Sequence, residues 1–199
     1  SMSSSKQKVY QTKLPSNASW FELSTGRLVV KSKVMMTNDG NFNVVSTPKT
    51  IQHIPVFVRS GSFIPMSPII QSTEAYRDTA VVLHFYVNPK ALDSSSFVWY
   101  EDDGTTYDAE AKGLTKKLYC TAITQSKNCT VTFTPEIGAN LWEKYFQFIL
   151  LIHTPVSPKE VIWNGQKVAF KFDQDKQTLQ FKEISKLKVS SPQQIELKW

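Results

Sequence analysis

The sequence lacks long hydrophobic runs and any segment that resembles a targeting signal. Its longest uninterrupted apolar stretch, from Phe148 to Ile152, matches a single buried strand and falls far short of the about 18 residues that a membrane helix needs. The first residues, from Ser1 to Ser5, contain no apolar core of the kind found in signal peptides, and we interpret them as a cloning remnant and a frayed end. We therefore predict no membrane partner.

Glycine is also scarce, with 7 residues in a chain of 199, and the 10 prolines are scattered. Hydrophobic residues make up 41% of the composition and aromatic residues 12%, with Phe and Tyr the most frequent aromatics. This composition favours short strands separated by turns over long helices. The length allows either one large hydrophobic core or two small ones.

Positive charge is present but not concentrated. Basic residues outnumber acidic ones by 23 to 17, which gives a net charge of +6. They are spread along the chain, with local pairs such as Lys116–Lys117, and they form no stripe interleaved with aromatic residues of the kind that binds nucleic acid. We predict no nucleic-acid partner and interpret these lysines as part of a solvated surface.

Short blocks of β-branched and aromatic residues, each bounded by turn residues, indicate strands along the whole chain. The pair Asn164-Gly165 lies between two apolar runs and predicts a tight hairpin, because both turn positions need a positive φ. Residues 173 to 176 predict a second turn. The predicted strands span Arg27 to Val34, Asn41 to Val45, Ile54 to Arg59, Ala80 to Val87, Phe97 to Glu101, Lys116 to Ala122, Cys129 to Pro135, Tyr145 to His153, Glu160 to Trp163, Val168 to Phe172, Thr178 to Glu183 and Gln193 to Lys198.

The number and spacing of these strands predict an all-β fold made of two antiparallel β-sandwich modules in tandem, with little helix. The polar stretch from Gln71 to Thr79 places the boundary between a first module at residues 1–78 and a second at 79–199. A further polar stretch, from Pro89 to Ser96, has the length of a hairpin loop within the second module.

The chain contains only two cysteines, Cys120 and Cys129, on either side of a polar turn. A hairpin could bring them opposite each other, so we consider a disulfide; the alternative is two free, half-buried thiols. Asn17 and Asn128 begin sequons for N-glycosylation. Together these features favour the secretory pathway or an extracellular location over a reducing compartment.

Two stretches carry a resemblance to a known family, residues 54–66 (IPVFVRSGSFIPM) and residues 99–107 (WYEDDGTTY). Both resemble signatures of glycoside hydrolase family 31, and Trp20-Phe21 followed by Thr25-Gly26 resembles a turn that precedes the first stretch in that family. The likeness covers roughly residues 9 to 110. Two positions depart from it, because Ser60 stands where a second glycine is common and Phe63 where an aliphatic residue is usual.

The resemblance implies a parent enzyme similar to α-glucosidases, which hydrolyses α-glycosidic bonds with retention through two carboxylates about 5 Å apart on a (β/α)₈ barrel. Such a barrel needs about 250 residues of alternating strand and helix, so this chain cannot contain it. The resemblance therefore implies the C-terminal, proximal and distal, β-sandwich region of such an enzyme. No catalytic residue carries over, no cofactor is expected, and the expected partner is the barrel of the same polypeptide.

Other chemistry finds little support in the residues. The cluster Glu101-Asp102-Asp103 invites a cation site at Asp102 and Asp103, but adjacent strand residues point to opposite faces and the spacing is not that of a calcium loop. We favour a turn at Asp103-Gly104 whose carboxylates cap backbone N–H groups. The three histidines have no metal-binding spacing, and no Gly-x-Ser-x-Gly motif or phosphate-binding glycine loop occurs.

Aromatic residues offer the main alternative function. Exposed Trp and Tyr side chains can stack on sugars, and Trp142, Trp20 and Tyr107 are the candidates for binding an α-glucan or oligosaccharide. Two hypotheses stay open: a non-catalytic support for the barrel, which predicts a bare apolar patch, and a carbohydrate-binding module. A third, an adhesion sandwich, is disfavoured by the two family-like stretches.

Overall fold

Alternation of buried and exposed side chains along two long strands defines the centre of the molecule. In the computed structural model, which describes residues 9–29, 33–37, 40–48, 54–67, 81–181 and 187–199, these are β9 (Thr115–Gln125) and β10 (Asn128–Ile137). Leu118, Cys120 and Ala122 point into the core while the residues between them are more exposed. One face of each strand is therefore apolar and must be covered by a second sheet.

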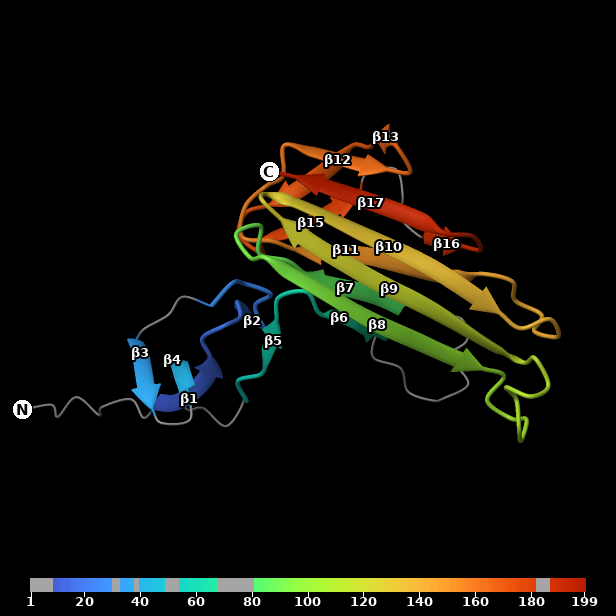
Figure 1. The fold of residues 1–199 in the computed structure, drawn as a ribbon, viewed down its shortest axis with the longest axis horizontal. Helices are drawn as coiled ribbons and strands as arrows, with labels where there is room; N and C mark the ends of the chain where they lie inside the picture. Colours follow the sequence, from blue (N-terminus) through green and yellow to red (C-terminus); the bar gives the residue numbers. More distant parts are fainter. Residues whose placement is uncertain (1–8, 30–32, 38–39, 49–53, 68–80, 182–186) are drawn as a thin grey trace, which may run out of the picture.

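Two large sheets provide that cover for each other (Figure 1). The first has the order β13-β12-β17-β10-β9-β8, and the second has the order β14-β15-β11-β7-β6, with β16 also paired to β11. The remaining bounds in this sandwich are β6 (Phe63–Met66), β7 (Val81–Tyr86), β8 (Asp93–Asp102), β11 (Phe146–His153), β12 (Glu160–Trp163), β13 (Gln166–Lys167), β14 (Phe170–Asp173), β15 (Thr178–Phe181), β16 (Leu187–Val189) and β17 (Gln193–Lys198).

The hydrophobic core lies between these sheets. It includes Trp99 from β8, Phe133 from β10, Phe148 from β11 and Phe85 from β7, with ring centroids of Phe133 and Phe148 5.6 Å apart. Each buried aromatic ring of this size removes a large apolar area from water. This arrangement confirms the predicted all-β sandwich class. The described residues contain no helix, and hence none that could cross a membrane.

A smaller part of the chain lies beside the sandwich (Figure 1). It comprises a three-stranded sheet in the order β1-β4-β3, formed by β1 (Val9–Pro15), β3 (Lys33–Thr37) and β4 (Gly40–Pro48), and the pair β2 (Trp20–Glu22) and β5 (Phe57–Arg59). The predicted strand from Arg27 to Val34 is confirmed at Lys33 and Val34, which belong to β3, and is wrong before them, where Leu28 forms only an isolated bridge with Phe21. Residues 30–32 lie outside the described residues.

The sheet pairing crosses the predicted module boundary at 78/79. Strand β6 belongs to the predicted first module, yet it pairs with β7 of the second, with Phe63 opposite Phe85. Phe63 is buried in the core of the large sandwich, 4.5 Å from Phe85 between ring centroids. The predicted boundary stretch, 71–79, lies outside the described residues. Strand β6, which lies before the predicted boundary, is therefore part of a sheet of the second module.

The predicted loop from Pro89 to Ser96 is also partly wrong. Residues from Asp93 to Ser96 belong to β8, and each has a partner on β9, such as Ser96 opposite Thr121. Serine has low strand propensity on its own, but a neighbouring strand that supplies a full hydrogen-bond ladder overrides that preference.

Both predicted tight turns are confirmed. Asn164 and Gly165 have positive φ between β12 and β13, and Asp173 lies opposite Thr178 across the second turn.

Candidate functional site

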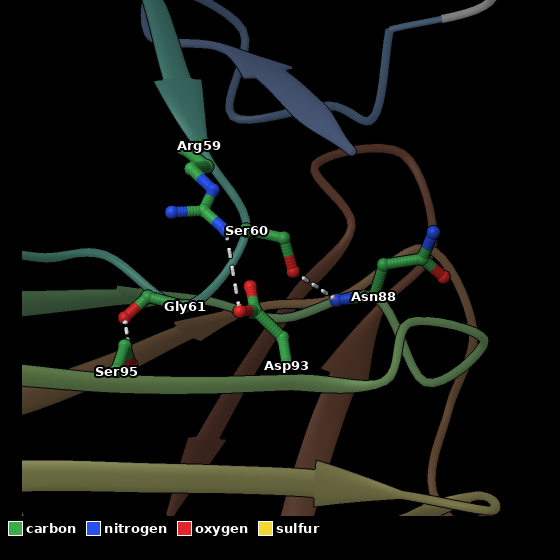
Figure 2. Close-up of polar contacts among 6 residues, drawn as sticks. All are labelled: Arg59, Ser60, Gly61, Asn88, Asp93 and Ser95. Atoms are coloured by element: carbon green, nitrogen blue, oxygen red, sulfur yellow. Dashed lines mark hydrogen bonds and ion pairs between the residues drawn. The ribbon is translucent and has the colours of Figure 1, made fainter. Parts of the chain in front are cut away.

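The first family-like stretch forms the joint between the small part of the chain and the sandwich (Figure 2). After β5 the chain turns at Gly61, whose φ of 89° suits glycine. The Gly61 N–H donates to the Tyr86 carbonyl at 2.7 Å, and the Ser95 hydroxyl donates to the Gly61 carbonyl at 2.6 Å. A Cβ added at Gly61 would lie 3.1 Å from the Ser95 side chain, so the turn packs closely against β8.

Side chains around this turn strengthen the joint. The Asn88 N–H donates to Ser60 Oγ at 3.0 Å, and the Asn88 side-chain amide donates to Ser19 Oγ at 2.8 Å. Arg59 forms an ion pair with Asp93 at 3.4 Å (Figure 2). Ser60 departs from the family pattern, and its Oγ accepts the hydrogen bond from the Asn88 N–H. A glycine at this position has no side-chain oxygen to accept that bond. These contacts hold the turn of the stretch against the sandwich.

The second family-like stretch ends in a self-contained turn. Asp103 accepts hydrogen bonds from the backbone N–H groups of Thr105 and Thr106, at 3.3 and 2.9 Å, and from the Thr106 hydroxyl. Asp102 accepts one from the Gly104 N–H at 2.8 Å. The bonds from Thr106 are the largest reason why the pKa of Asp103 is lowered to about 2. The capping role predicted for these carboxylates is confirmed.

A metal at Asp102 and Asp103 finds no further ligands on the described part of the chain. There, no three or more His, Cys, Asp or Glu side chains gather closely enough to hold an ion. The oxygens of Asp103 are already committed to the turn. The two aspartates therefore hold the loop after β8 in shape.

The two cysteines do not lie opposite each other, so the possible disulfide is wrong and the alternative of two free thiols is confirmed. In the hairpin of β9 and β10, Cys129 is opposite Thr124 and Cys120 is opposite Phe133. The thiols are therefore four rungs apart along the ladder, well beyond the reach of a disulfide. Both are free and buried in the core, where burial raises the pKa of Cys120 to about 12 and that of Cys129 to about 11.

The glycosylation candidates lie on the surface of the chain. Asn17 is exposed in the turn between β1 and β2, and Asn128 is exposed at the start of β10. Both side chains are therefore open to solvent, as attachment of a glycan would require.

The three aromatic candidates fall into two places. Trp142 is 98% exposed and Tyr107 is 84% exposed, and their loops adjoin at one end of the sandwich. Asn140 donates to the Lys112 carbonyl at 2.9 Å, and Lys112 Nζ donates to the Tyr107 carbonyl at 3.0 Å. Trp20 lies in β2, within the small part of the chain at the opposite end (Figure 1). The structure brings Tyr107 and Trp142 to one end and leaves Trp20 apart.

A histidine pair forms a polar cluster that the sequence did not indicate. His84 on β7 and His153 on β11 approach within 2.9 Å through Nδ1 and Nε2, and Tyr86 stacks on His153 with ring centroids 4.2 Å apart. Burial, with a smaller contribution from His84, lowers the pKa of His153 to about 4. Burial also lowers the pKa of His84 and raises that of Tyr86 to about 12.

Lys116 corrects the interpretation of the lysines as solvated surface. It is only 5% exposed, because it shares the inward face of β9 with Leu118 and Cys120. Its Nζ lies 2.9 Å from Glu101 and also contacts Glu143. Burial alone would lower the pKa of Lys116, but the hydrogen bonds to Glu143 and Glu101 outweigh it and the pKa is raised. The neighbouring Lys117 pairs with Glu110 at 2.5 Å.

Comparisons with known proteins show which solved structures share this fold. No protein-family model matches the sequence, and a search of curated proteins found no match. Among solved structures, a mutant of the glycoside hydrolase family 31 dextranase from Flavobacterium johnsoniae, complexed with isomaltotriose, is similar with a TM-score of 0.76 and 20% identity. The similarity covers 98% of this chain and 25% of the dextranase chain.

Two further structures are similar over almost the whole chain. The family 31 α-xylosidase from Xanthomonas citri has a TM-score of 0.59 and 16% identity, over 95% of this chain and 17% of its own. The α-1,4-glucan lyase from Gracilariopsis lemaneiformis has a TM-score of 0.61 and 18% identity, over 97% of this chain and 21% of its own. The resemblance to family 31 is thus confirmed at the level of the fold, and this chain has the fold of a segment that makes up about 25% of a family 31 dextranase.

Proposed function

We propose that this chain is a non-catalytic β-sandwich segment of a longer family 31 glycoside hydrolase, in which it supports the catalytic barrel. The observation that carries the proposal is the structural similarity over 98% of this chain to only 25% of a family 31 dextranase. The two family-like stretches agree with it, because they form the joint and a capped turn, both of which are structural features. The carboxylates that cleave the glycosidic bond in such enzymes belong to the barrel.

The substrate of the parent enzyme is an α-linked glucoside in our proposal. The similar enzymes act on different α-linked substrates, judging from the names dextranase, α-xylosidase and α-1,4-glucan lyase. An α-glucosidase-like activity with retention is the reaction that the sequence resemblance implies.

Apolar side chains on the outward face of two strands provide a surface for the barrel or another part of the parent. Val98 and Tyr100 on β8 and Ile123 on β9 are each about half exposed, and the register of the two strands puts them on one face. Exposed apolar residues that gather on one face favour a protein contact. These three side chains support the proposal, because a supporting role predicts an apolar surface that is left bare.

Activity measurements on two proteins test the proposal. Chromogenic α-glucosides and α-xylosides would be offered to this chain and to the complete product of its gene. We expect hydrolysis only by the complete product. Hydrolysis by the 199-residue chain itself would contradict the non-catalytic role, and a gene product no longer than this chain would contradict the parent enzyme.

Substitutions on the proposed contact surface test the supporting role separately. Val98→Lys with Tyr100→Lys should lower the melting temperature of the complete product and leave that of the isolated chain nearly unchanged, because both side chains are already exposed in the chain. Gln180→Lys, an exposed position on β15 in the other large sheet, is the matched control. Equal shifts in both proteins would count against this surface.

A second candidate function is carbohydrate binding through Tyr107 and Trp142, which is supported by their exposure on adjoining loops. Titration with malto-oligosaccharides at millimolar concentration should then change the tryptophan fluorescence, and Trp142→Ala should remove that change. An unchanged spectrum of the wild-type chain would rule this site out.

A further inference from the structure

The histidine pair lies on the outer face of its sheet, away from the core of the sandwich. His84 lies between Leu83 and Phe85 on β7, and both of these neighbours belong to the core. His153 follows Ile152 of β11, which belongs to the core as well. Because successive residues of a strand point to opposite faces, both imidazoles point away from the packing between the two large sheets.

The small part of the chain covers this outer face at the histidines. Phe21 of β2 is fully buried, with its ring centroid 5.4 Å from that of Tyr86, which stacks on His153. The turn after β2 reaches the same ring, since a Cβ added at Gly26 would lie 2.6 Å from His153 Nδ1 and 2.8 Å from its Cε1. His153 is only 5% exposed. Its imidazole is therefore enclosed between the sandwich and the small part.

No carboxylate among the described residues compensates a positive charge on this pair. Burial lowers the pKa of both rings, and the charge of His84 lowers the pKa of His153 further, while the backbone of Gly26 opposes the shift by a smaller amount. Glu22 and Asp173 accept hydrogen bonds within their own turns. The titratable groups on the elements packed against His153 are His84 and Tyr86 on β7, Glu22 and Arg27 on β2 and the turn after it, and Asp173, Asp175 and Lys176 before β15.

The other described bonds between the small part and the sandwich are neutral, with one exception. The Leu28 N–H donates to Gln177 Oε1 at 3.0 Å, and the bonds at Asn88 join amide and hydroxyl groups. These contacts do not change with pH. The exception is the ion pair of Arg59 with Asp93, which serves below as the control.

We propose that the histidine pair is an acid-sensitive contact that holds the small part against the sandwich. At neutral pH the two neutral rings share one hydrogen bond, and Phe21 and Gly26 enclose them. Protonation of both rings breaks that bond and places two positive charges side by side, which requires water to reach them. The small part then moves away around the turn at Gly61, while the two large sheets stay packed. This inference goes beyond the proposed function and does not depend on the parent enzyme.

The direction of the pH effect follows from the two states of His153. In the released state its pKa is the ordinary 6.5, and in the enclosed state its pKa is lowered to about 4. The contribution of His153 to the closed arrangement is therefore complete above pH 6.5 and is lost as the pH falls toward about 4.

Hydrogen exchange of the backbone amides, followed by nuclear magnetic resonance on the isotope-labelled 199-residue chain, tests the proposal. Rates would be measured from neutral pH down to about 4 and divided by those of unprotected amides at each pH. The Leu28 N–H, bonded to Gln177 across the joint, reports on the small part, and the Val131 N–H on β10, a strand paired on both sides, reports on the sandwich. We expect the protection of Leu28 to fall at least about tenfold as the pH falls from 6.5 to about 4, while Val131 stays protected.

Two histidine variants and one control assign the effect. His153→Gln and His84→Gln each replace one titrating ring with a neutral amide, so the pH at which Leu28 loses protection should fall by about one unit or more. Asp93→Asn removes the carboxylate from the ion pair with Arg59, and in this variant Leu28 should still lose protection as the pH falls from 6.5 to about 4.

Each of the following results would overturn the proposal. Leu28 stays protected down to pH about 4, or Leu28 and Val131 lose protection together, which would mean that the whole chain unfolds. Equally, the loss of protection persists unchanged in both histidine variants, or it disappears in Asp93→Asn.

Discussion

Nδ1 of His84 lies 2.9 Å from Nε2 of His153, although the two residues are 69 positions apart in the sequence. The parallel pairing of β7 with β11, which puts Tyr86 opposite His153 and His84 opposite Leu151, brings them together. One ring nitrogen must donate its N–H to the other, so at least one ring has to be neutral. The contact is incompatible with protonation of both histidines.

The stability of the chain should therefore fall in acid. The pKa of His153 is lowered to about 4 from an unfolded value of 6.5. Between these two pH values, His153 is protonated in the unfolded chain and neutral in the folded chain. This stability is fully present above pH 6.5 and is lost as the pH falls toward about 4, by on the order of 3 kcal/mol. Urea unfolding at several pH values measures it. In His153→Gln the curve should be flatter across this window, and an equal slope would contradict the assignment.

Gly26→Ala should destabilise the fold. A Cβ at this position would lie 2.6 Å from His153 Nδ1, and Gly26 has a φ of +69°, so the substitution combines backbone strain with a clash in a buried cluster. We expect a loss of about 2–4 kcal/mol. Gly104→Ala is the control, since its φ is +72° but a Cβ would meet nothing within 4 Å. Thermal unfolding should show a smaller loss in Gly104→Ala; equal losses would mean that the contact with His153 does not matter.

Removal of the buried Lys116 ammonium should cost stability as well. Lys116→Ala leaves Glu101 and Glu143 without their shared partner and removes the packing of the lysine stem, so we expect a loss of about 1–3 kcal/mol; both glutamates retain some access to solvent, which limits the effect. Lys116→Met keeps the stem and should cost less. Lys167→Met, at the exposed pair with Glu160, should change the free energy of unfolding by under about 1 kcal/mol. A similar result at Lys167 and Lys116 would contradict the role of burial.

Cys120 and Cys129 should be unreactive thiols in the folded chain. Both are buried, and burial raises the pKa of Cys120 to about 12 and that of Cys129 to about 11, so the reactive thiolate is absent near neutral pH. Iodoacetamide should label neither residue in buffer and both in denaturant without any reductant. Labelling in denaturant that requires a reductant would reveal a disulfide.

Features set by neighbouring residues could be predicted from the sequence. The hairpin at Asn164-Gly165 follows from two residues that tolerate positive φ, and the capped turn at Asp103 follows from a short acidic side chain beside glycine and threonine. In both cases the partners lie within three residues, so the local pattern contains nearly all of the information.

Features set by distant partners could not be predicted in the same way. Lys116 is buried because two glutamates from other parts of the chain compensate its charge, and the strand position of Ser96 depends on its pairing with β9. The same reason applies to His84 and His153, which are 69 positions apart in the sequence and meet only because β7 pairs with β11. A lone histidine has no sequence signal until the fold shows which side chains surround it.

The position of β6 in the sheet of the large sandwich has a consequence for how the protein is made. β6 leaves the ribosome before β11, the strand at the centre of its sheet. Until then Phe63 and the edge of β6 have no complete sheet to join, and an exposed edge with aromatic residues invites contacts with other nascent chains. We expect this sheet to form slowly, and only after β11 has been synthesised. Until then the nascent chain should depend on chaperones, although the folded protein does not.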